Sequence, residues 1–265
     1  MNKRADIPVS VIVMTKNEER NIRECLESLS AFAEVFVSDS NSVDRTVEIA
    51  RELGANVVSF TWNGKYPKKK QWCLDNLPFK HDWVLYVDAD EQIQPALAEE
   101  IRVLMQTKPR HSGYFVKLDY VFLGHVLRFG HQVNKLVLLD RRKGKFLDYD
   151  DLDAANMWEV EGHYQPEISG SVGRLKGRIL HDDHDALYSF FDRQNRYTDW
   201  EAHLRAKGKL SNPRESQLGL RSAMKRVFNA LPMRGVVAFV HCYFLRLGFL
   251  DGPAGFHFAL WRGFY

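Results

Sequence analysis

Short apolar, β-branched runs alternate with segments that carry apolar residues on one helical face in the first part of the chain. The apolar runs predict buried strands at 9–14, 35–37, 57–60 and 83–87. The segments between and after them predict helices at 22–29, 47–53, 68–76 and 95–105. Thr15-Lys16-Asn17-Glu18 fits a capping box that opens the first of these helices. Strands joined through helices favour right-handed crossovers, so an α/β fold with a mostly parallel sheet flanked by helices is expected.

The second half of the chain has a less regular pattern. Strands are predicted at 114–122 and 136–139, an acid-rich loop or strand pair at 157–171, and a helix at 187–204. The remaining residues are basic, aromatic and helical in pattern. We therefore expect a catalytic domain over residues 1–204 and a helical appendage over 205–265.

Composition supports a folded chain with one large core. The 265 residues are 45% hydrophobic and 12% aromatic, which argues against disorder. Cys25, Cys73 and Cys242 are scattered without metal-ligand spacing, as expected for reduced thiols in the cytoplasm. The net charge is only +3, but the stretch 203–226 holds seven Lys or Arg opposed by Glu215 alone. Such a block suits an anionic surface, such as a membrane face or phosphates.

The two ends of the sequence bear on where the protein acts. The N-terminal residues show no apolar stretch of the kind found in a signal peptide, and the late apolar run 236–245 is too short to span a bilayer. Aromatic residues interleaved with arginines over 231–265 suit a membrane interface. We expect a peripheral protein on the inner face of the cytoplasmic membrane. A helix pair packed on the domain and a homo-oligomer interface remain alternatives, and the sequence contains no nucleic-acid-binding motif.

Polar residues gather where the predicted strands end. Thr15 to Glu18 follow the first strand, Asp39 follows the second, and Asp88 and Asp90 follow the fourth. Ligands of such sheets bind beyond the carboxyl ends of the strands, so these side chains are expected to converge. The first strand is not followed by GxGxxG, which argues against a dehydrogenase.

The triplet Asp88-Ala89-Asp90 is the sharpest chemical signal. Two carboxylates at the end of a buried strand can share Mg²⁺ or Mn²⁺, which prefer oxygen ligands and substrate phosphates. A departing nucleotide diphosphate needs that charge compensation. The alternative is an acidic turn before the helix at Pro95.

Two further residues are candidates for the nucleotide. Asp39 could accept a hydrogen bond from a ribose hydroxyl or a base N–H, or it could be a turn residue. Lys70 could reach a phosphate from the start of a helix.

Several segments together resemble a known family. VIVMTKNEERNIRECLESL, VSDSNSVDRTVEIARELGA, KKKQWCLD and WVLYVDADE resemble the inverting family-two glycosyltransferases of the GT-A fold. The later GRLKGRILHDDH and FFDRQNRYTDWEA are similar to the branch that contains lipopolysaccharide core and exopolysaccharide glycosyltransferases. The resemblance covers nearly the whole chain in order.

The resemblance implies roles for individual residues. It places the metal on Asp90, with His181 assisting the metal or the diphosphate. His181 could instead be a structural histidine at a strand end. The donor is expected to be a nucleotide sugar, namely a UDP-sugar. The residues that the resemblance implies for binding it are Thr15, Asn17, Glu18, Asp39, Lys70 and Asp88.

The general base is less defined by the sequence. Members of the branch commonly carry a His-Glu pair ahead of the GRLKG-like segment, and this chain has no such dipeptide. An inverting transfer needs one carboxylate to take the acceptor proton. Glu161 is the first choice, and Glu159 and Glu167 are the alternatives.

The expected function is metal-dependent, inverting transfer of a sugar from a nucleotide sugar to a lipid-linked glycan or a lipopolysaccharide core. One alternative is a synthase that glycosylates polyprenyl phosphate directly. Another is a non-catalytic nucleotide-sugar-binding scaffold, which the missing His-Glu pair would suit. The sequence leaves the sugar, the acceptor and the linkage open, because small differences in pocket contacts decide them.

Overall fold

The computed structural model describes residues 6–154, 157–161, 165–208 and 233–264. The chain divides by its contacts into two compact units. The sheet unit comprises Met1–Val121, Val133–Leu147 and Glu159–Asp185, and the C-terminal unit comprises Phe122–Gln132, Asp148–Trp158 and Ala186–Tyr265. The helix predicted at 187–204 is thus grouped with the C-terminal helices, while a functional boundary after residue 204 stays a prediction.

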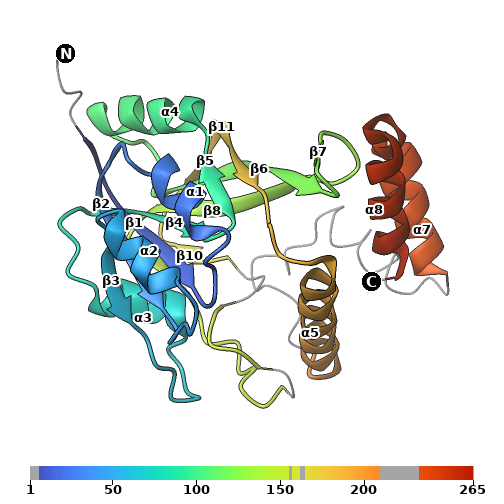
Figure 1. Cartoon of the computed structure of the whole chain (residues 1–265), viewed down its shortest axis with the longest axis horizontal. Coiled ribbons are helices and arrows are strands. Elements are labelled where there is room, and N and C mark those ends of the chain that lie inside the picture. Colours follow the sequence, from blue (N-terminus) through green and yellow to red (C-terminus); the bar gives the residue numbers. More distant parts are fainter. Residues whose placement is uncertain (1–5, 155–156, 162–164, 209–232, 265) are drawn as a thin grey trace. The chain divides into compact units, whose positions relative to one another are not determined.

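The first part of the sheet unit alternates strands and helices as the sequence predicts (Figure 1). Each predicted element is found, with ends shifted by a few residues. The elements are β1 (Ile7–Thr15), α1 (Ile22–Ser28), β2 (Phe32–Asp39), α2 (Thr46–Glu52), β3 (Asn56–Ser59), α3 (Lys69–Asn76) and β4 (Trp83–Asp88).

The remainder of the sheet unit is richer in strands than the sequence pattern indicates. The helix α4 (Pro95–Gln106) begins with proline in its first turn, where a missing N–H costs nothing. The strands are β5 (Glu91–Ile93), β6 (Gly113–Phe122), β8 (Val133–Asp140), β9 (Gly144–Lys145), β10 (Glu167–Ile168) and β11 (Val172–His181). The short strand β7 (His125–Leu127) falls within the residues of the C-terminal unit.

The main sheet has the strand order β3-β2-β1-β4-β8-β6-β11-β5, with β7 paired to β6. The strands β3, β2, β1 and β4 are parallel, and β11 is parallel to β6. The strand β8 lies between β4 and β6 and is antiparallel to both, and β5 is antiparallel to β11. The expected α/β fold, with a mostly parallel sheet flanked by helices and with C-terminal helices, is confirmed.

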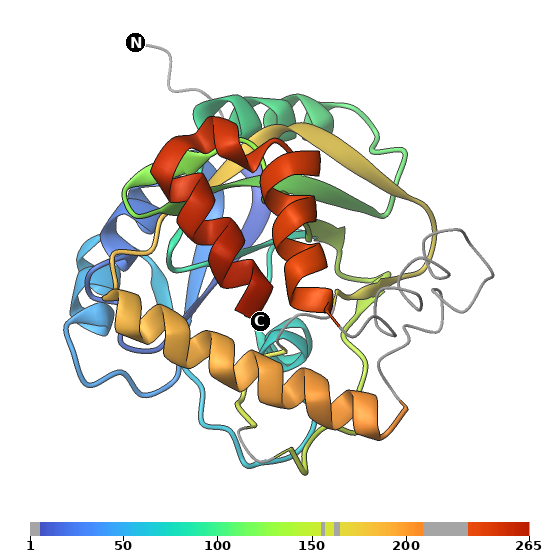
Figure 2. The same ribbon diagram turned by 90° about the vertical axis from the view of Figure 1, so that its right-hand side faces the viewer.

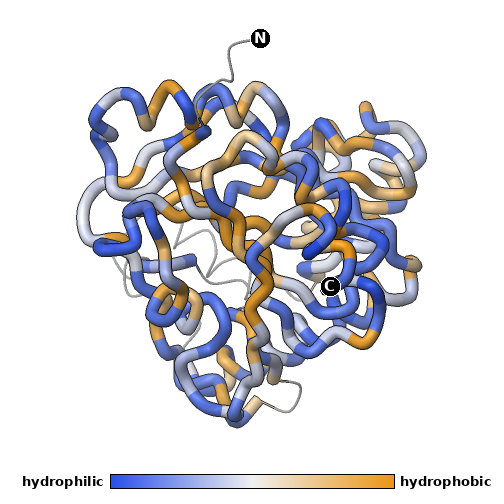
Figure 3. The backbone as a smooth tube through the Cα atoms, turned by 60° about the vertical axis from the view of Figure 1, so that its left-hand side comes forward, coloured by the Kyte–Doolittle hydropathy of each residue, from blue (hydrophilic) through white to orange (hydrophobic). Residues whose placement is uncertain are grey.

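Both faces of the sheet are covered. On β1, Val11 and Val13 pack in a cluster that includes residues of α1, α2 and α4. The alternate residues Ile12 and Met14 pack in a second cluster with Cys73 of α3. Successive side chains of a strand point to opposite faces, so the β1 segment Val11–Met14, which is buried on both faces, is apolar throughout. Figure 3 shows apolar stretches of the backbone in orange.

The C-terminal unit contains α5 (Leu187–Ala206), α7 (Arg234–Val240), the π-helical turn η1 (His241–Leu245), the 3₁₀ turn η2 (Gly248–Asp251) and α8 (Gly252–Phe264). The helices α7 and α8 lie side by side (Figure 2). Glycines permit this, because a Cβ on Gly235 would lie 2.2 Å from the carbonyl oxygen of Gly263. Part of the basic block, residues 209–226, lies outside the described residues.

Within residues 6–154, 157–161, 165–208 and 233–264, no single helix is long and apolar enough to cross a bilayer. The helical segments Arg234–Leu245 and Gly248–Phe264 meet the length and composition criteria only when taken together, and they are bent by 72°.

Candidate active site

The carboxyl ends of three neighbouring parallel strands form the edge on which predicted site residues gather. Thr15 of β1 lies opposite Asp39 of β2, and Met14 of β1 lies opposite Asp88 of β4. This is the edge at which parallel α/β sheets bind ligands. The structure therefore brings Thr15, Asp39 and Asp88 to one edge, as the sequence pattern predicts.

Asp39 is held in a hydrogen-bonded loop. The Thr15 hydroxyl donates to Asp39 Oδ1 at 2.9 Å, and Ser42 donates its backbone N–H to Oδ2 at 2.9 Å and its hydroxyl to Oδ1 at 2.5 Å. The Asp39 side chain is buried. These bonds fix the turn after β2 and orient the carboxylate, which corresponds to the turn-forming alternative. Turn formation and contact with a ribose are compatible, because a carboxylate has about four acceptor positions.

The expected capping box at Thr15–Glu18 is wrong. The helix α1 begins at Ile22, and its N-cap residue makes no side-chain cap bond. Asn17 instead has a left-handed backbone (φ 59°), which asparagine tolerates. Its N–H donates to Ser42 Oγ at 2.8 Å, and the Glu18 N–H donates to Thr46 Oγ1 at 2.7 Å. The loop after β1 is therefore tied to the loop after β2.

Glu18 lies in a negatively charged setting. Burial raises its pKa to about 8, and the nearby carboxylates Asp90, Asp185 and Asp183 add to the rise. A hydrogen bond of 2.9 Å from the Asn21 amide opposes it. At neutral pH the Glu18 carboxyl is consequently protonated, so it can donate a hydrogen bond to a ligand as well as accept one.

Lys135 of β8 joins the carboxylates that follow β4. Its Nζ is hydrogen-bonded to Asp88 Oδ2 and lies 2.8 Å and 3.0 Å from the two carboxylate oxygens of Glu91. Glu91 Oε2 also accepts the Asp88 N–H at 2.9 Å. Burial opposes ionisation of Asp88, but Lys135 and Lys70 outweigh it and hold the Asp88 pKa well below its usual range. Asp88 is therefore ionised, and its charge is balanced by a lysine.

Asp90 faces a different cation. His181, at the end of β11, places Nδ1 at 3.4 Å from Asp90 Oδ1. The centre of its ring lies 4.3 Å from that of the Tyr120 ring, with the two planes tilted by 38°. Burial alone would lower the pKa of His181, but Asp90 and then Glu91 raise it to about 9. His181 is thus protonated at neutral pH. A protonated imidazole can contact a diphosphate directly but must release its proton before it ligates a cation.

The donor set fits a divalent cation that is completed by substrate. Over the described ranges, no cluster of three or more His, Cys, Asp or Glu side chains is arranged to hold a metal ion. The Asp90 and His181 side chains are 21% and 15% exposed, which leaves both within reach of a ligand. Mg²⁺ usually keeps several waters and takes one or two carboxylates plus phosphates, so Asp90 suits it without a full protein cage.

Two adjacent lysines at the start of α3 have different surroundings. Lys69 Nζ donates to the Thr15 carbonyl at 2.8 Å and to Ser40 Oγ at 2.6 Å. Burial lowers the pKa of Lys69 to about 8. Lys70 Nζ lies 5.9 Å from the centre of the Phe146 ring, and burial lowers its pKa while Asp88 opposes the change. Lys69 thus ties the ends of β1 and β2, and the predicted Lys70 lies within electrostatic reach of Asp88.

Glu161 is placed at the N-terminus of α3. Its Oε2 accepts the Lys70 N–H at 2.6 Å and its Oε1 accepts the Gln71 N–H at 2.8 Å, while the residue is 0% exposed. The first turn of a helix leaves backbone N–H groups unpaired, and a carboxylate is favoured there. Burial raises the pKa of Glu161, and the bond from Gln71 opposes the rise. This arrangement favours a capping role over proton abstraction.

The two alternative residues differ in their distance from Glu161, since one also lies at the start of α3 and the other lies in a separate small sheet. The backbone carbonyl of Glu159 accepts the Lys69 N–H at 2.8 Å, which places Glu159 beside the start of α3. Glu167 lies opposite Lys145 in the two-stranded β9–β10 sheet. Residues 162–164 lie outside the described residues. The identity of the general base among Glu159, Glu161 and Glu167 therefore stays a prediction.

Sequence reasoning missed Lys135, Glu91 and Lys69. Glu91 was visible in the sequence as a third acidic residue after β4. Lys69 stands beside the predicted Lys70, and only the side-chain geometry separates them. The sequence gives no signal that pairs Lys135 with Asp88, because the pairing depends on insertion of the antiparallel β8 beside β4.

Comparison with known proteins gives matches along the chain. A profile described as Glycosyl transferase family 2 matches residues 10–157. An uncharacterised glycosyltransferase of Rickettsia typhi is 28% identical over 202 residues, which cover 73% of this chain and 66% of that protein. A lipopolysaccharide core biosynthesis glycosyltransferase of Rhizobium meliloti is 25% identical over 264 residues, which cover 97% of this chain and 83% of that protein.

Solved structures also match in part. A glucosyl-3-phosphoglycerate synthase from Mycobacterium tuberculosis, crystallised with Mn²⁺, UDP and glucosyl-3-phosphoglycerate, has a TM-score of 0.34 and 25% identity. The match covers 43% of this chain and 44% of that protein.

The Glu18→Gln variant should be more stable than the parent protein in alkaline buffer. The parent carboxyl is protonated when folded and ionised when unfolded between pH 4.5 and about 8, so its stability falls as the pH rises through this window. The variant should gain about 1 to 3 kcal/mol in free energy of unfolding near pH 8.5, after allowance for partial exposure. Urea unfolding with chelator present measures this, and the exposed Glu27→Gln provides the control. An equal gain at pH 4 would contradict the assignment.

The Lys135→Met variant should be strongly destabilised. It leaves Asp88 and the buried Glu91 without their cation, and removing one partner of a buried pair costs about 3 to 5 kcal/mol. Neutralising the partner in the double variant Lys135→Met/Glu91→Gln should restore part of this loss. Denaturant unfolding measures both, with the exposed Lys145→Met as control. A double variant no more stable than Lys135→Met would show that charge compensation is not the cause.

Proposed function

The chain belongs to glycosyl transferase family 2, and we propose that it transfers a sugar from a UDP-sugar to a lipid-linked glycan or lipopolysaccharide core acceptor. It is a glycosyltransferase, and its family implies a nucleotide-sugar donor. The proposal extends to inversion at the sugar and to dependence on Mg²⁺ or Mn²⁺. The observation that carries it is the pair of carboxylates after β4, each facing a cation, at the same sheet edge as Thr15 and Asp39.

The loops after β1 and β2 are proposed to hold the nucleoside. Asp39 is ordered by Thr15 and Ser42, which makes it a preorganised acceptor for ribose hydroxyls. Asn17 and Glu18 belong to the same hydrogen-bonded loops, so they are assigned to the same part of the donor. Asp88 would contact the ribose or diphosphate from the neighbouring strand.

Positive side chains at this edge are proposed to neutralise the diphosphate. Lys70 is buried near Asp88, and His181 is protonated beside Asp90, so both can face phosphate oxygens. Asp90 is the proposed ligand of Mg²⁺ or Mn²⁺, which when bound would supply Lewis-acid charge compensation as the diphosphate departs. These groups would stabilise the nucleoside diphosphate as leaving group, and they do not determine which sugar is transferred.

The acceptor assignment is supported by the C-terminal unit and by the Rhizobium relative. The segment 234–264 exposes large apolar side chains together with Arg234, Arg246 and Arg262. That composition suits an anionic membrane interface, where lipid-linked glycans are reached. We therefore propose peripheral association with the cytoplasmic membrane face.

Transfer assays with defined acceptors test the function. The full chain is given radiolabelled nucleotide sugars with Mn²⁺ and either a lipopolysaccharide core fragment, a lipid-linked oligosaccharide or bare polyprenyl phosphate. We expect inverted product on a glycan-bearing acceptor. Product on polyprenyl phosphate alone would favour the synthase, and donor binding without turnover in the whole panel would overturn the proposal.

The Asp90→Asn variant tests the metal assignment within these assays. We expect transfer to fall by about a hundredfold or more while circular dichroism and unfolding stay near those of the parent protein. The exposed Asp6→Asn substitution makes the same chemical change outside the site and should leave turnover unchanged. Full turnover by Asp90→Asn, or by the parent protein in excess chelator, would exclude the metal role.

The Glu161→Gln variant separates a base from a helix cap. A base gives a fall in kcat of about 10² to 10⁴ and loss of the pH dependence of kcat, with KM little changed. From the capping geometry we expect instead a loss of about 1 kcal/mol in stability and a raised KM for the donor, because the start of α3 carries Lys69 and Lys70. Glu167→Gln serves as the comparison. A kcat collapse with unchanged stability would restore Glu161 as the base.

A further inference from the structure

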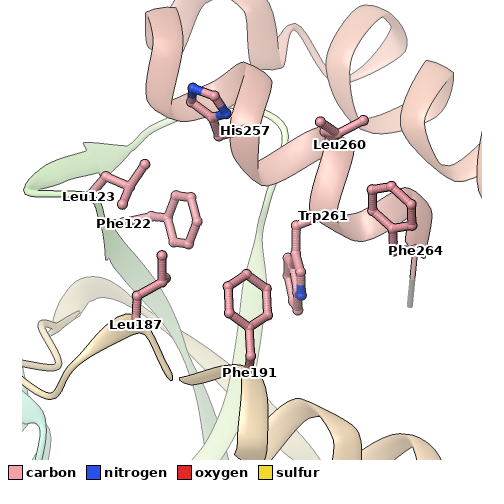
Figure 4. Close-up of a pocket in the computed structure, with 8 residues that line it drawn as sticks. All are labelled: Phe122, Leu123, Leu187, Phe191, His257, Leu260, Trp261 and Phe264. Atoms are coloured by element: carbon pink, nitrogen blue, oxygen red, sulfur yellow. The ribbon is translucent and has the colours of Figure 1, made fainter. Parts of the chain in front are cut away.

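The C-terminal unit contains an apolar pocket of about 700 Å³ (Figure 4). Its walls come from three parts of the unit. Phe122 and Leu123 lie at the end of β6, and Leu187 and Phe191 belong to α5. The helix α8 contributes His257, Leu260, Trp261 and Phe264. The volume falls within the range of small-molecule pockets, which is roughly 300 to 1,000 Å³.

The lining is apolar both at its base and at its rim. Phe122 and Trp261 are buried, whereas Leu187, Leu260 and Phe264 are 46%, 42% and 79% exposed. Of the eight described lining residues, seven are leucine, phenylalanine or tryptophan, and His257 is the remaining one. A concave apolar surface with an exposed apolar rim favours a hydrocarbon ligand over a polar one.

The surface formed by α7, η1, η2 and α8 also exposes apolar side chains. Exposed apolar side chains include Phe244, Leu245 and Leu250, which are 53%, 72% and 54% exposed. Over 233–264 the arginines at 234, 246 and 262 face a single acidic residue, Asp251. The Asp251 carboxylate is already engaged by the backbone N–H groups of Arg128 and Phe129, both at 3.0 Å. The exposed charge that remains is positive and complements an anionic headgroup.

We propose that this pocket binds one hydrocarbon chain of the lipid acceptor, with the anionic headgroup left at the arginine-bearing surface. The identity of the lipid as the acceptor rests on the proposed function. Binding of the hydrocarbon does not rest on that function, because it requires only the apolar pocket and the basic surface. The end of the hydrocarbon can enter past Leu187 and Leu260, and each CH₂ that is buried then adds to the affinity.

Binding of alkyl phosphates of increasing length tests the proposal. Octyl, decyl and dodecyl phosphate are titrated into the full chain by calorimetry below their critical micelle concentrations, with inorganic phosphate as the headgroup control. We expect affinity to rise about fourfold for each added CH₂. The pocket-filling variant Leu260→Trp should remove this length dependence. Leu250→Trp changes another exposed leucine, which lies outside the pocket lining, and should retain it.

A second pair of variants guards against misfolding. Leu187→Trp fills the pocket from α5, and Tyr188→Trp alters its exposed neighbour outside the lining. Equal length dependence in pocket and control variants, or none in the parent protein, overturns the proposal. So does a Leu260-dependent dimer in gel filtration, which would assign the pocket to a second copy. If hydrocarbon binding is lost but transfer to a lipid-free glycan is intact, this proposal fails and the proposed function stands. If hydrocarbon binding is intact but no transfer occurs, only the proposed function fails.

Discussion

The ion pair between Lys135 and the carboxylates of Asp88 and Glu91 is the interaction on which the candidate site depends. Asp88, Asp90 and Glu91 fall within four consecutive positions at the end of a buried strand. Unit charges a few ångströms apart in a protein repel by several kcal/mol, so these carboxylates need a cation to remain ionised together. Lys135 provides it from the one strand that runs against its neighbours β4 and β6. The antiparallel insertion of β8 is thus the topological feature that permits an acidic site here.

Among the positive side chains at this edge, Lys135 and His181 are suited to different purposes, which are stability and ligand binding. Lys135 is committed to Asp88 and the buried Glu91, so it holds the end of β4 in place. His181 faces Asp90 at a longer distance, and both side chains remain partly exposed. A site that must accept a charged donor needs groups whose present partners can be exchanged. The Asp90–His181 pair meets that requirement better than the Lys135 pairs, which makes it the centre of the proposed donor site.

The sheet unit and the C-terminal unit follow different physical rules. In the sheet unit, apolar residues alternate between two faces and are covered by helices on both. In the C-terminal unit, apolar side chains also line a pocket and lie on the surface beside arginines. Burial explains the first pattern fully. Burial does not account for the second pattern, whereas the proposed contact with lipid would.

The sequence by itself determined the α/β alternation, because strand and helix periodicities depend only on neighbouring residues. It also determined the placement of Thr15, Asp39 and Asp88 at one edge, since parallel strands end on the same side of a sheet. It misjudged Thr15–Glu18, whose backbone bonds go to the loop after β2 instead of to a helix. Only the tertiary structure decided the partners of the charged groups. Lys135 meets Asp88, His181 meets Asp90, and Glu161 meets the start of α3 across long stretches of chain, and such pairings arise from strand order, which local sequence does not encode.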